Sequence, residues 1–185
     1  MKKLSVVSFA LLLFLVTAQI QAKVTDRATN KESKKELRSE RKELRKLESP
    51  SVNIVSSNSF YENFGNVSNV KWRSSDYFDE ATFNKDGHET TAFFDFDGKL
   101  VGTTQIKTLA DVPARGLRDI KKRYKDYRIG PVIYFDDNEF NETDMMLYNL
   151  QFDDEDNYFV ELTKGASRII VRVDTAGGVY FFKQL

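Results

Sequence analysis

The residue types that most often carry out catalysis are scarce in this sequence, which contains one histidine, His88, and no cysteine. A nucleophilic hydrolase needs a serine activated by a base, or a cysteine paired with histidine. His88 lies in the stretch KDGHE, which is typical of a solvated turn and is a poor place to orient a base. One histidine also cannot supply the ligands of a usual zinc site. We therefore expect neither histidine-based catalysis nor a histidine-based zinc site.

Carboxylates are the other groups with potential chemistry. Asp95 and Asp97 are close in sequence, and residues 136–144 and 153–157 form two acidic stretches. Catalysis on a glycan would need two carboxylates that converge on a cleft with separated pKa values, and the sequence shows no such convergence. The two stretches offer oxygen ligands for calcium, but neither has the spacing of a helix-loop-helix calcium site. We expect soluble acidic loops and no cofactor, with calcium as the alternative.

Aromatic residues are the third signal, because the chain has fifteen Phe and eight Tyr. Phe78 and Phe159 are out of phase with the core-facing residues of their predicted strands, so one buried sheet face does not account for them. Aromatic packing on both sheet faces would explain them, and so would an exposed platform that binds a protein or a glycan. The candidates for a partner-binding surface are Tyr61, Phe78, Tyr148, Phe159 and Tyr180.

The amino-terminal segment has the pattern of a secretory signal peptide. Lys2 and Lys3 precede the apolar run from Val6 to Val16, and the small residues Ala18 and Ala22 follow. The run is shorter than the roughly 20 apolar residues of a membrane-spanning helix, which makes a retained anchor the weaker interpretation. We expect cleavage after Ala22, with Ala18 as the alternative, no transmembrane anchor after cleavage, and a periplasmic or secreted protein.

A charged arm over residues 23–50 should follow the signal peptide. It holds ten basic and six acidic residues, whereas residues 51–185 hold sixteen basic and twenty-two acidic ones. Strong helix formers over 31–48 predict a solvated helix, either a spacer or a weak partner-binding or self-association helix. Export and the acidic domain disfavour a nucleic-acid partner. Oligomeric state is left open.

Residues 51–185 are predicted to form one α+β domain made of two similar halves. The spacing of Ser59, Phe60, Phe64 and Val67 predicts a short helix, and period-2 alternation then predicts four strands. Asp111-Val112-Pro113 predicts a second helix, with Asp111 as its cap, followed by a second antiparallel run. The predicted strands of that run are Val132 to Tyr134, Met146 to Phe152, Tyr158 to Leu162, Ile169 to Val173 and Val179 to Phe182.

Turn and core positions complete the prediction. Asp97-Gly98 should join Phe96 to Lys99 as a two-residue turn, and a similar hairpin is expected at 173–177. The residues with predicted structural roles are Trp72, Phe94, Gly98, Pro113, Leu117 and Tyr124.

The order of these positions resembles a family of exported proteins. The matching residues are Val70-x-Trp72, Tyr77 to Phe83, Gly87, Ala92 to Phe94, Asp97-Gly98-Lys99-Leu100, Pro113, Leu117, Tyr124 and Ile129. They resemble the PepSY-like, beta-lactamase-inhibitor-like (BLIP-like) proteins of Gram-negative bacteria over most of residues 60–185. The resemblance implies a small periplasmic or secreted α+β fold with helices packed on antiparallel sheet. The charged arm and the acidic insert 136–144 depart from it.

These observations favour a noncatalytic exported binding module. Its expected partner is a protein of the cell envelope, for example an exported hydrolase that it binds or inhibits. Two alternatives are an envelope-stress or structural protein and a glycan-active enzyme that uses two carboxylates.

Overall fold

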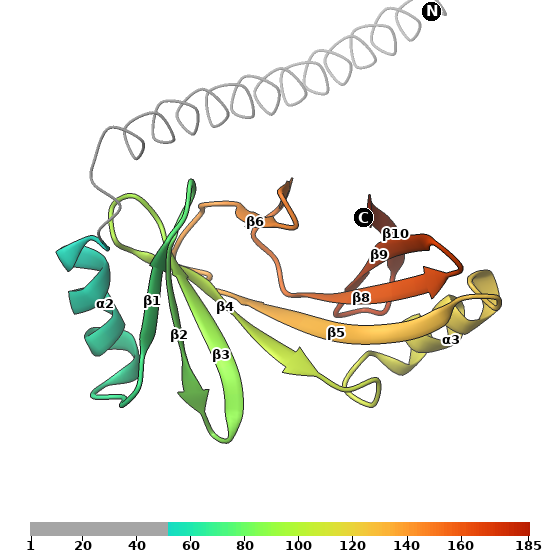
Figure 1. Cartoon of the computed structure of the whole chain (residues 1–185), viewed down its shortest axis with the longest axis horizontal. Coiled ribbons are helices and arrows are strands. Elements are labelled where there is room, and N and C mark those ends of the chain that lie inside the picture. The colour runs from blue at the N-terminus through green and yellow to red at the C-terminus, as the bar shows by residue number, and fades with distance from the viewer. Residues whose placement is uncertain (1–51) are drawn as a thin grey trace, which may run out of the picture. The chain divides into compact units, whose positions relative to one another are not determined.

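Eight antiparallel strands form one continuous sheet in the order β1-β2-β3-β4-β5-β8-β9-β10 (Figure 1). The computed structural model describes residues 52–185. The predicted signal peptide at 1–22 and the predicted charged helical arm at 23–50 lie outside these residues. The first half holds α2 (Ile54–Phe64), β1 (Lys71–Ser74), β2 (Asp79–Lys85), β3 (His88–Phe94) and β4 (Leu100–Lys107). The second holds α3 (Ala114–Arg123), β5 (Arg128–Asp137), β8 (Asn157–Lys164), β9 (Ser167–Asp174) and β10 (Val179–Gln184), and β6 (Met145–Leu147) and β7 (Leu150–Phe152) form a separate hairpin.

The predicted α+β fold with two helix-plus-meander halves is confirmed. In each half a helix precedes four strands of the sheet, and an aspartate lies where the last two strands turn, Asp95 directly after β3 and Asp174 at the end of β9. The Asp95 side chain accepts a hydrogen bond from the backbone N–H of Lys99 over 2.9 Å, and the Asp174 side chain accepts one from that of Gly178 over 2.7 Å. The two hairpin loops are therefore closed by equivalent bonds.

Glycine at the tip of each hairpin loop lets the loop approach the preceding helix. Gly98 has φ +72° and Gly177 has φ +81°. A Cβ on Gly98 would lie 2.9 Å from the backbone nitrogen of the third residue of α2, and a Cβ on Gly177 would lie 2.9 Å from that of the third residue of α3. Both positions combine a left-handed backbone with a close approach, so both need glycine.

The helix starts differ from the sequence prediction. The α2 helix begins five residues before the predicted Ser59, because the Asn53 side chain caps it by accepting the Val55 N–H over 2.9 Å. In α3 the capping position is Pro113, and no side chain makes a capping hydrogen bond there. The predicted cap Asp111 instead accepts bonds from the N–H and the hydroxyl of Thr108. These bonds lower the pKa of Asp111, and its role is to stabilise the turn before the helix.

Two strand predictions are also wrong. The segment predicted as one strand from Met146 to Phe152 is the β6-β7 hairpin, because Tyr148 and Asn149 have φ of 53° and 58° and reverse the chain. The third strand ends at Phe94 rather than at Phe96, and the connection to β4 is the five-residue loop 95–99. The buried Asp95 side chain organises this loop, so it cannot be the two-residue turn that Asp97-Gly98 predicted.

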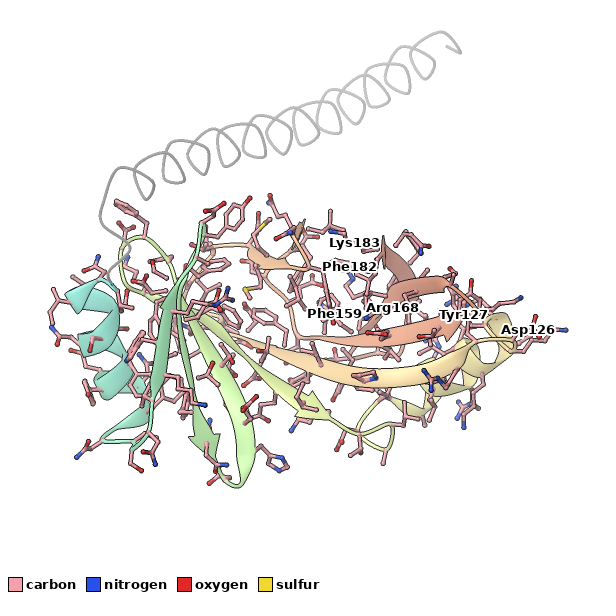
Figure 2. The ribbon with its side chains drawn as sticks, viewed as in Figure 1. Asp126, Tyr127, Phe159, Arg168, Phe182 and Lys183 are labelled. Atoms are coloured by element: carbon pink, nitrogen blue, oxygen red, sulfur yellow. The ribbon has the colours of Figure 1, made fainter. Side chains whose placement is uncertain are left out.

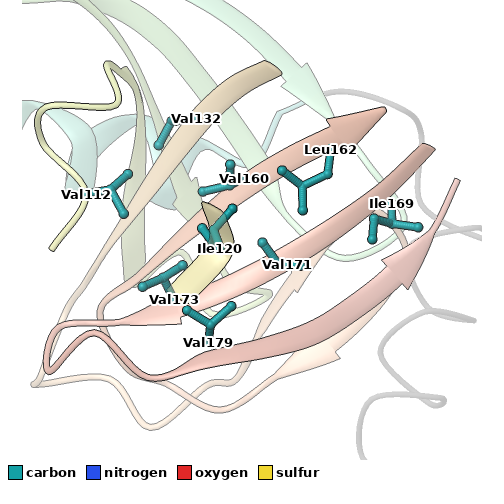
Figure 3. Close-up of a cluster of buried hydrophobic side chains, with 9 residues drawn as sticks. All are labelled: Val112, Ile120, Val132, Val160, Leu162, Ile169, Val171, Val173 and Val179. Atoms are coloured by element: carbon teal, nitrogen blue, oxygen red, sulfur yellow. The ribbon is translucent and has the colours of Figure 1, made fainter. Parts of the chain in front are cut away.

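Apolar residues fill both faces of the sheet. On one face α2 packs against β1–β4, and α3 packs against the other half, where nine buried residues form the cluster in Figure 3. On the opposite face of the sheet the β6-β7 hairpin covers a third cluster. Consecutive residues of a strand point to opposite faces, and in β8 Phe159 belongs to this third cluster whereas Val160 belongs to the cluster under α3. The members of the third cluster are Phe78, Phe93, Val101, Phe135, Met145, Phe152, Phe159 and Ile170.

Candidate functional site

Two of the five residues predicted for a partner-binding surface are buried. Phe78 is 4% exposed and Phe159 is 0% exposed, so the expectation that they face a partner is wrong. Phe159 packs against Phe152 of the hairpin and against Phe182 of β10, with ring centroids 4.9 Å apart in both pairs (Figure 2). The phase of Phe159 reflects the third cluster, under the β6-β7 hairpin, and Phe78 packs into the same cluster from the connection between β1 and β2.

The other three candidates lie on separate elements. Tyr61 on α2 is 52% exposed, and Tyr180 on the edge strand β10 is 49% exposed. Tyr148 occupies the β6-β7 turn and is partly buried, which raises the pKa of its hydroxyl. Because α2 packs on β1–β4 and β10 is the opposite edge, the structure does not gather the five residues into one surface.

Most residues with predicted structural roles lie in or beside the helix-facing cores. Trp72 is half-buried, and its ring meets that of the fully buried Phe60 of α2 edge-on, with centroids 5.5 Å apart. Phe94 is fully buried in the same cluster. Leu117 and Tyr124 are partly buried and pack on the cluster under α3.

His88 and Asp95, two of the residues considered for catalysis, are respectively exposed and engaged in a structural hydrogen bond. His88 is exposed at the first position of β3, directly after the Asp86-Gly87 turn. Asp95 is buried, and one carboxylate oxygen accepts a hydrogen bond from the Asn141 side-chain amide over 3.1 Å. It therefore organises two loops.

Pairing of β5 with β8 brings the two acidic stretches together. The Asp156 carboxylate accepts the backbone N–H of Asp137 over 2.8 Å and the Tyr134 hydroxyl over 2.9 Å. Burial is the main cause that raises the pKa of the Asp137 carboxyl to about 6, and the negative charge of the nearby Asp154 is the second cause. Among residues 52–185 no three His, Cys, Asp or Glu side chains are grouped to hold a metal ion. Calcium binding stays a prediction.

One pocket lies on the sheet face that the hairpin covers. It has a volume of about 420 Å³ and is bounded by the end of β1, the connection to β2, and the β6-β7 hairpin. Arg73 and Glu80 form an ion pair across its β1-β2 wall. Apolar lining comes from Phe78, Phe93, Met146 and Leu147. The pocket therefore has both charged and hydrophobic walls.

The most exposed large apolar residue in the described part of the chain was missed by the sequence analysis. Phe140 is 98% exposed, at the tip of a loop within the acidic stretch 136–144. The available signal was its isolation, because it is the only aromatic residue in the segment DDNEFNETD and two asparagines with turn propensity surround it.

Two asparagine side chains fix this loop on the sheet. Asn138 donates its side-chain amide to the carbonyl of Leu100 over 2.7 Å, and its backbone N–H to the carbonyl of Val101 over 3.0 Å. Asn141 is buried and donates to the same Leu100 carbonyl over 3.0 Å, as well as to Asp95. The backbone on both sides of Phe140 is therefore held while its side chain projects into solvent.

The architecture, two helices on one face of an eight-stranded antiparallel sheet, defines an α+β fold that occurs in solved structures. It is similar to a DUF2874 family protein from Bacteroides uniformis, with a TM-score of 0.60 and 12% identity over 72% of this chain and 90% of that chain. It is also similar to a BLIP-like protein from Bacteroides fragilis, with a TM-score of 0.57 and 15% identity over 76% of this chain and 91% of that one. A protein from Bacteroides eggerthii, provisionally described as periplasmic, has a TM-score of 0.58 and 14% identity over 73% and 88%.

These similarities show the fold and not an activity. No protein-family model and no curated protein sequence matches the chain. The fold agrees with the BLIP-like part of the sequence resemblance, and the PepSY-like part stays a prediction. Residues 52–185 include no helix with the length and hydrophobicity needed to span a bilayer.

Proposed function

We infer that this protein is a noncatalytic exported module whose function is to bind another protein of the cell envelope. The observation that carries the proposal is Phe140, a 98% exposed aromatic side chain on a loop that is held at both ends. Aromatic residues on rigid supports supply a disproportionate part of the energy of protein interfaces. Ordering such a loop costs little conformational entropy on binding, because it is already ordered.

Two further findings support this proposal. The fold is shared with a BLIP-like protein and with a protein provisionally described as periplasmic, and the sequence predicts a cleavable signal peptide. Two of the acidic residues that were candidates for a catalytic pair have structural partners, since Asp95 accepts a hydrogen bond from Asn141 and Asp156 accepts one from Tyr134. In this proposal the Phe140 loop replaces the predicted exposed aromatic platform, because the β6-β7 hairpin covers the sheet face that carries Phe159.

The test compares capture of envelope proteins by residues 23–185 and by their Phe140→Ala variant. The control is Phe181→Ala, which removes an exposed aromatic ring from β10. We expect at least one envelope protein that the wild type and the control retain and that Phe140→Ala loses. Equal recovery by all three proteins, across several salt concentrations, would contradict binding through this loop.

A further inference from the structure

The exposed start of α2 and the Phe140 loop both contact the hairpin loop 95–99. Ile54 and Val55 are both exposed large aliphatic residues in the first turn of this helix. Gly98 of the loop 95–99 lies against Val55, and Asn141 of the Phe140 loop is hydrogen-bonded to Asp95 of that same loop. The loop 95–99 therefore links the helix turn that carries Ile54 and Val55 to the loop that carries Phe140. We call Ile54, Val55 and Phe140 the docking surface.

Carboxylates surround the aromatic tip of this surface. Glu139 and Glu142 are exposed on either side of Phe140, and the stretch 136–144 contains five acidic residues and no basic residue. A negatively charged rim attracts a positively charged partner and repels an acidic one. It also opposes insertion of Phe140 into an anionic bilayer, so the charges favour a protein over a membrane surface.

We propose that the docking surface inserts Phe140 into an apolar pocket of a different protein, and that lysine and arginine side chains line the rim of that pocket. This proposal rests on the protein-binding function above and specifies the chemistry of the partner. Phe140 is the anchor, Ile54 and Val55 extend the apolar contact, and the two glutamates pair with the basic rim. Truncation of a central aromatic anchor should weaken the complex by at least about 30-fold.

The experiment uses the full-length chain with the photo-crosslinking residue p-benzoylphenylalanine at position 140, produced in cells that export it. The matched control carries the same residue at position 181, an exposed phenylalanine outside the docking surface. Charge is tested by adding E139K and E142K to the probe at position 140. A second control adds E62K and E89K, which makes the same change in net charge at exposed residues of α2 and β3.

We expect a heterologous protein adduct at position 140 and none at position 181. Its yield should fall at least about 10-fold with E139K and E142K, and also on raising the salt from about 0.05 to 0.5 M, because salt screens exposed charges. E62K and E89K should leave the yield unchanged. If the variant with E139K and E142K gives the same adduct yield as the variant with E62K and E89K, the partner pocket has no basic rim, while the proposed protein binding stands.

Three other outcomes would overturn the proposal in different ways. If the adduct yield at position 140 does not exceed that at position 181, both the docking surface and the proposed binding function are wrong. An adduct with the mass of two copies of this chain would identify a second copy as the occupant. An adduct with lipid or glycan, and with no protein, would show that the partner is not a protein.

Discussion

The hydroxyl of Ser56 donates a hydrogen bond to the carboxylate of Asp79 over 2.7 Å, and this bond joins the first turn of α2 to the first residue of β2. Both side chains are buried, at 0% and 2% exposed. The same carboxylate accepts the backbone N–H of Asn53 over 3.0 Å and the hydroxyl of Ser74 over 2.8 Å. Asp79 therefore connects the start of the helix to two strands through a single carboxylate.

Replacing Asp79 with alanine should lower the free energy of unfolding by about 3 kcal/mol, because it leaves the Ser56 hydroxyl buried without its acceptor and removes bonds to a charged group. Urea unfolding followed by circular dichroism measures this change. The control is Glu62→Ala on the exposed side of α2, which should change stability by less than about 0.5 kcal/mol. Similar midpoints for the two variants would contradict the role of Asp79.

Gly98 should tolerate substitution less well than Gly87. Both have left-handed φ, +72° and +83°, but a Cβ on Gly98 would lie 2.7 Å from a methyl carbon of Val55, whereas a Cβ on Gly87 meets nothing within 4 Å. Gly87→Ala should cost about 1 kcal/mol for the backbone alone, and Gly98→Ala about 3 kcal/mol because the steric contact is added. Equal costs in urea unfolding would show that the contact with α2 relaxes freely.

Trp72→Ala should destabilise the domain by about 3 kcal/mol, because the indole ring covers Phe60 and also contacts Phe94, with centroids 5.8 Å apart. Thermal unfolding by circular dichroism provides the measurement. The control is Tyr61→Ala, which truncates an exposed ring on α2 and should have a small effect. An unchanged midpoint for Trp72→Ala would exclude its core role.

Asp137 should make stability fall as pH rises. Its pKa in the folded state is about 6, above the ordinary value of 3.8, so the folded protein binds more protons than the unfolded chain between these values. This contribution is fully present below about pH 4 and is lost as pH rises through 6. Because the side chain is only partly buried, we discount the effect for solvent screening to about 1 to 2 kcal/mol.

The comparison is between the wild type and Asp137→Asn, which cannot ionise. The stability of the variant relative to the wild type should rise between pH 4 and 7 in urea titrations. Asp136→Asn, at the exposed neighbouring position, is the control. Parallel stability curves for the wild type and Asp137→Asn over this range would contradict the raised pKa.

The sequence by itself determined the fold class and its duplication, because these depend on periodicity and turn residues that are local in the chain. Alternation of apolar residues located most strands, and the similarity between the hairpins at 94–98 and 173–177 indicated two equivalent halves. Helix starts were predicted less well, since Asn53 and Ser56 depend on their own capping bonds and on a distant carboxylate at Asp79.

Only the tertiary structure decided which aromatic residues are exposed. The alternating phase of Phe159 shows that it faces away from the helices, but phase does not show whether another element covers that face. The β6-β7 hairpin does cover it, and this hairpin lies between β5 and β8 in the chain while packing on residues of both halves. Phe140 illustrates the converse: its exposure results from the hydrogen bonds of Asn138 and Asn141 to Leu100, a contact across about 40 residues that no local pattern encodes.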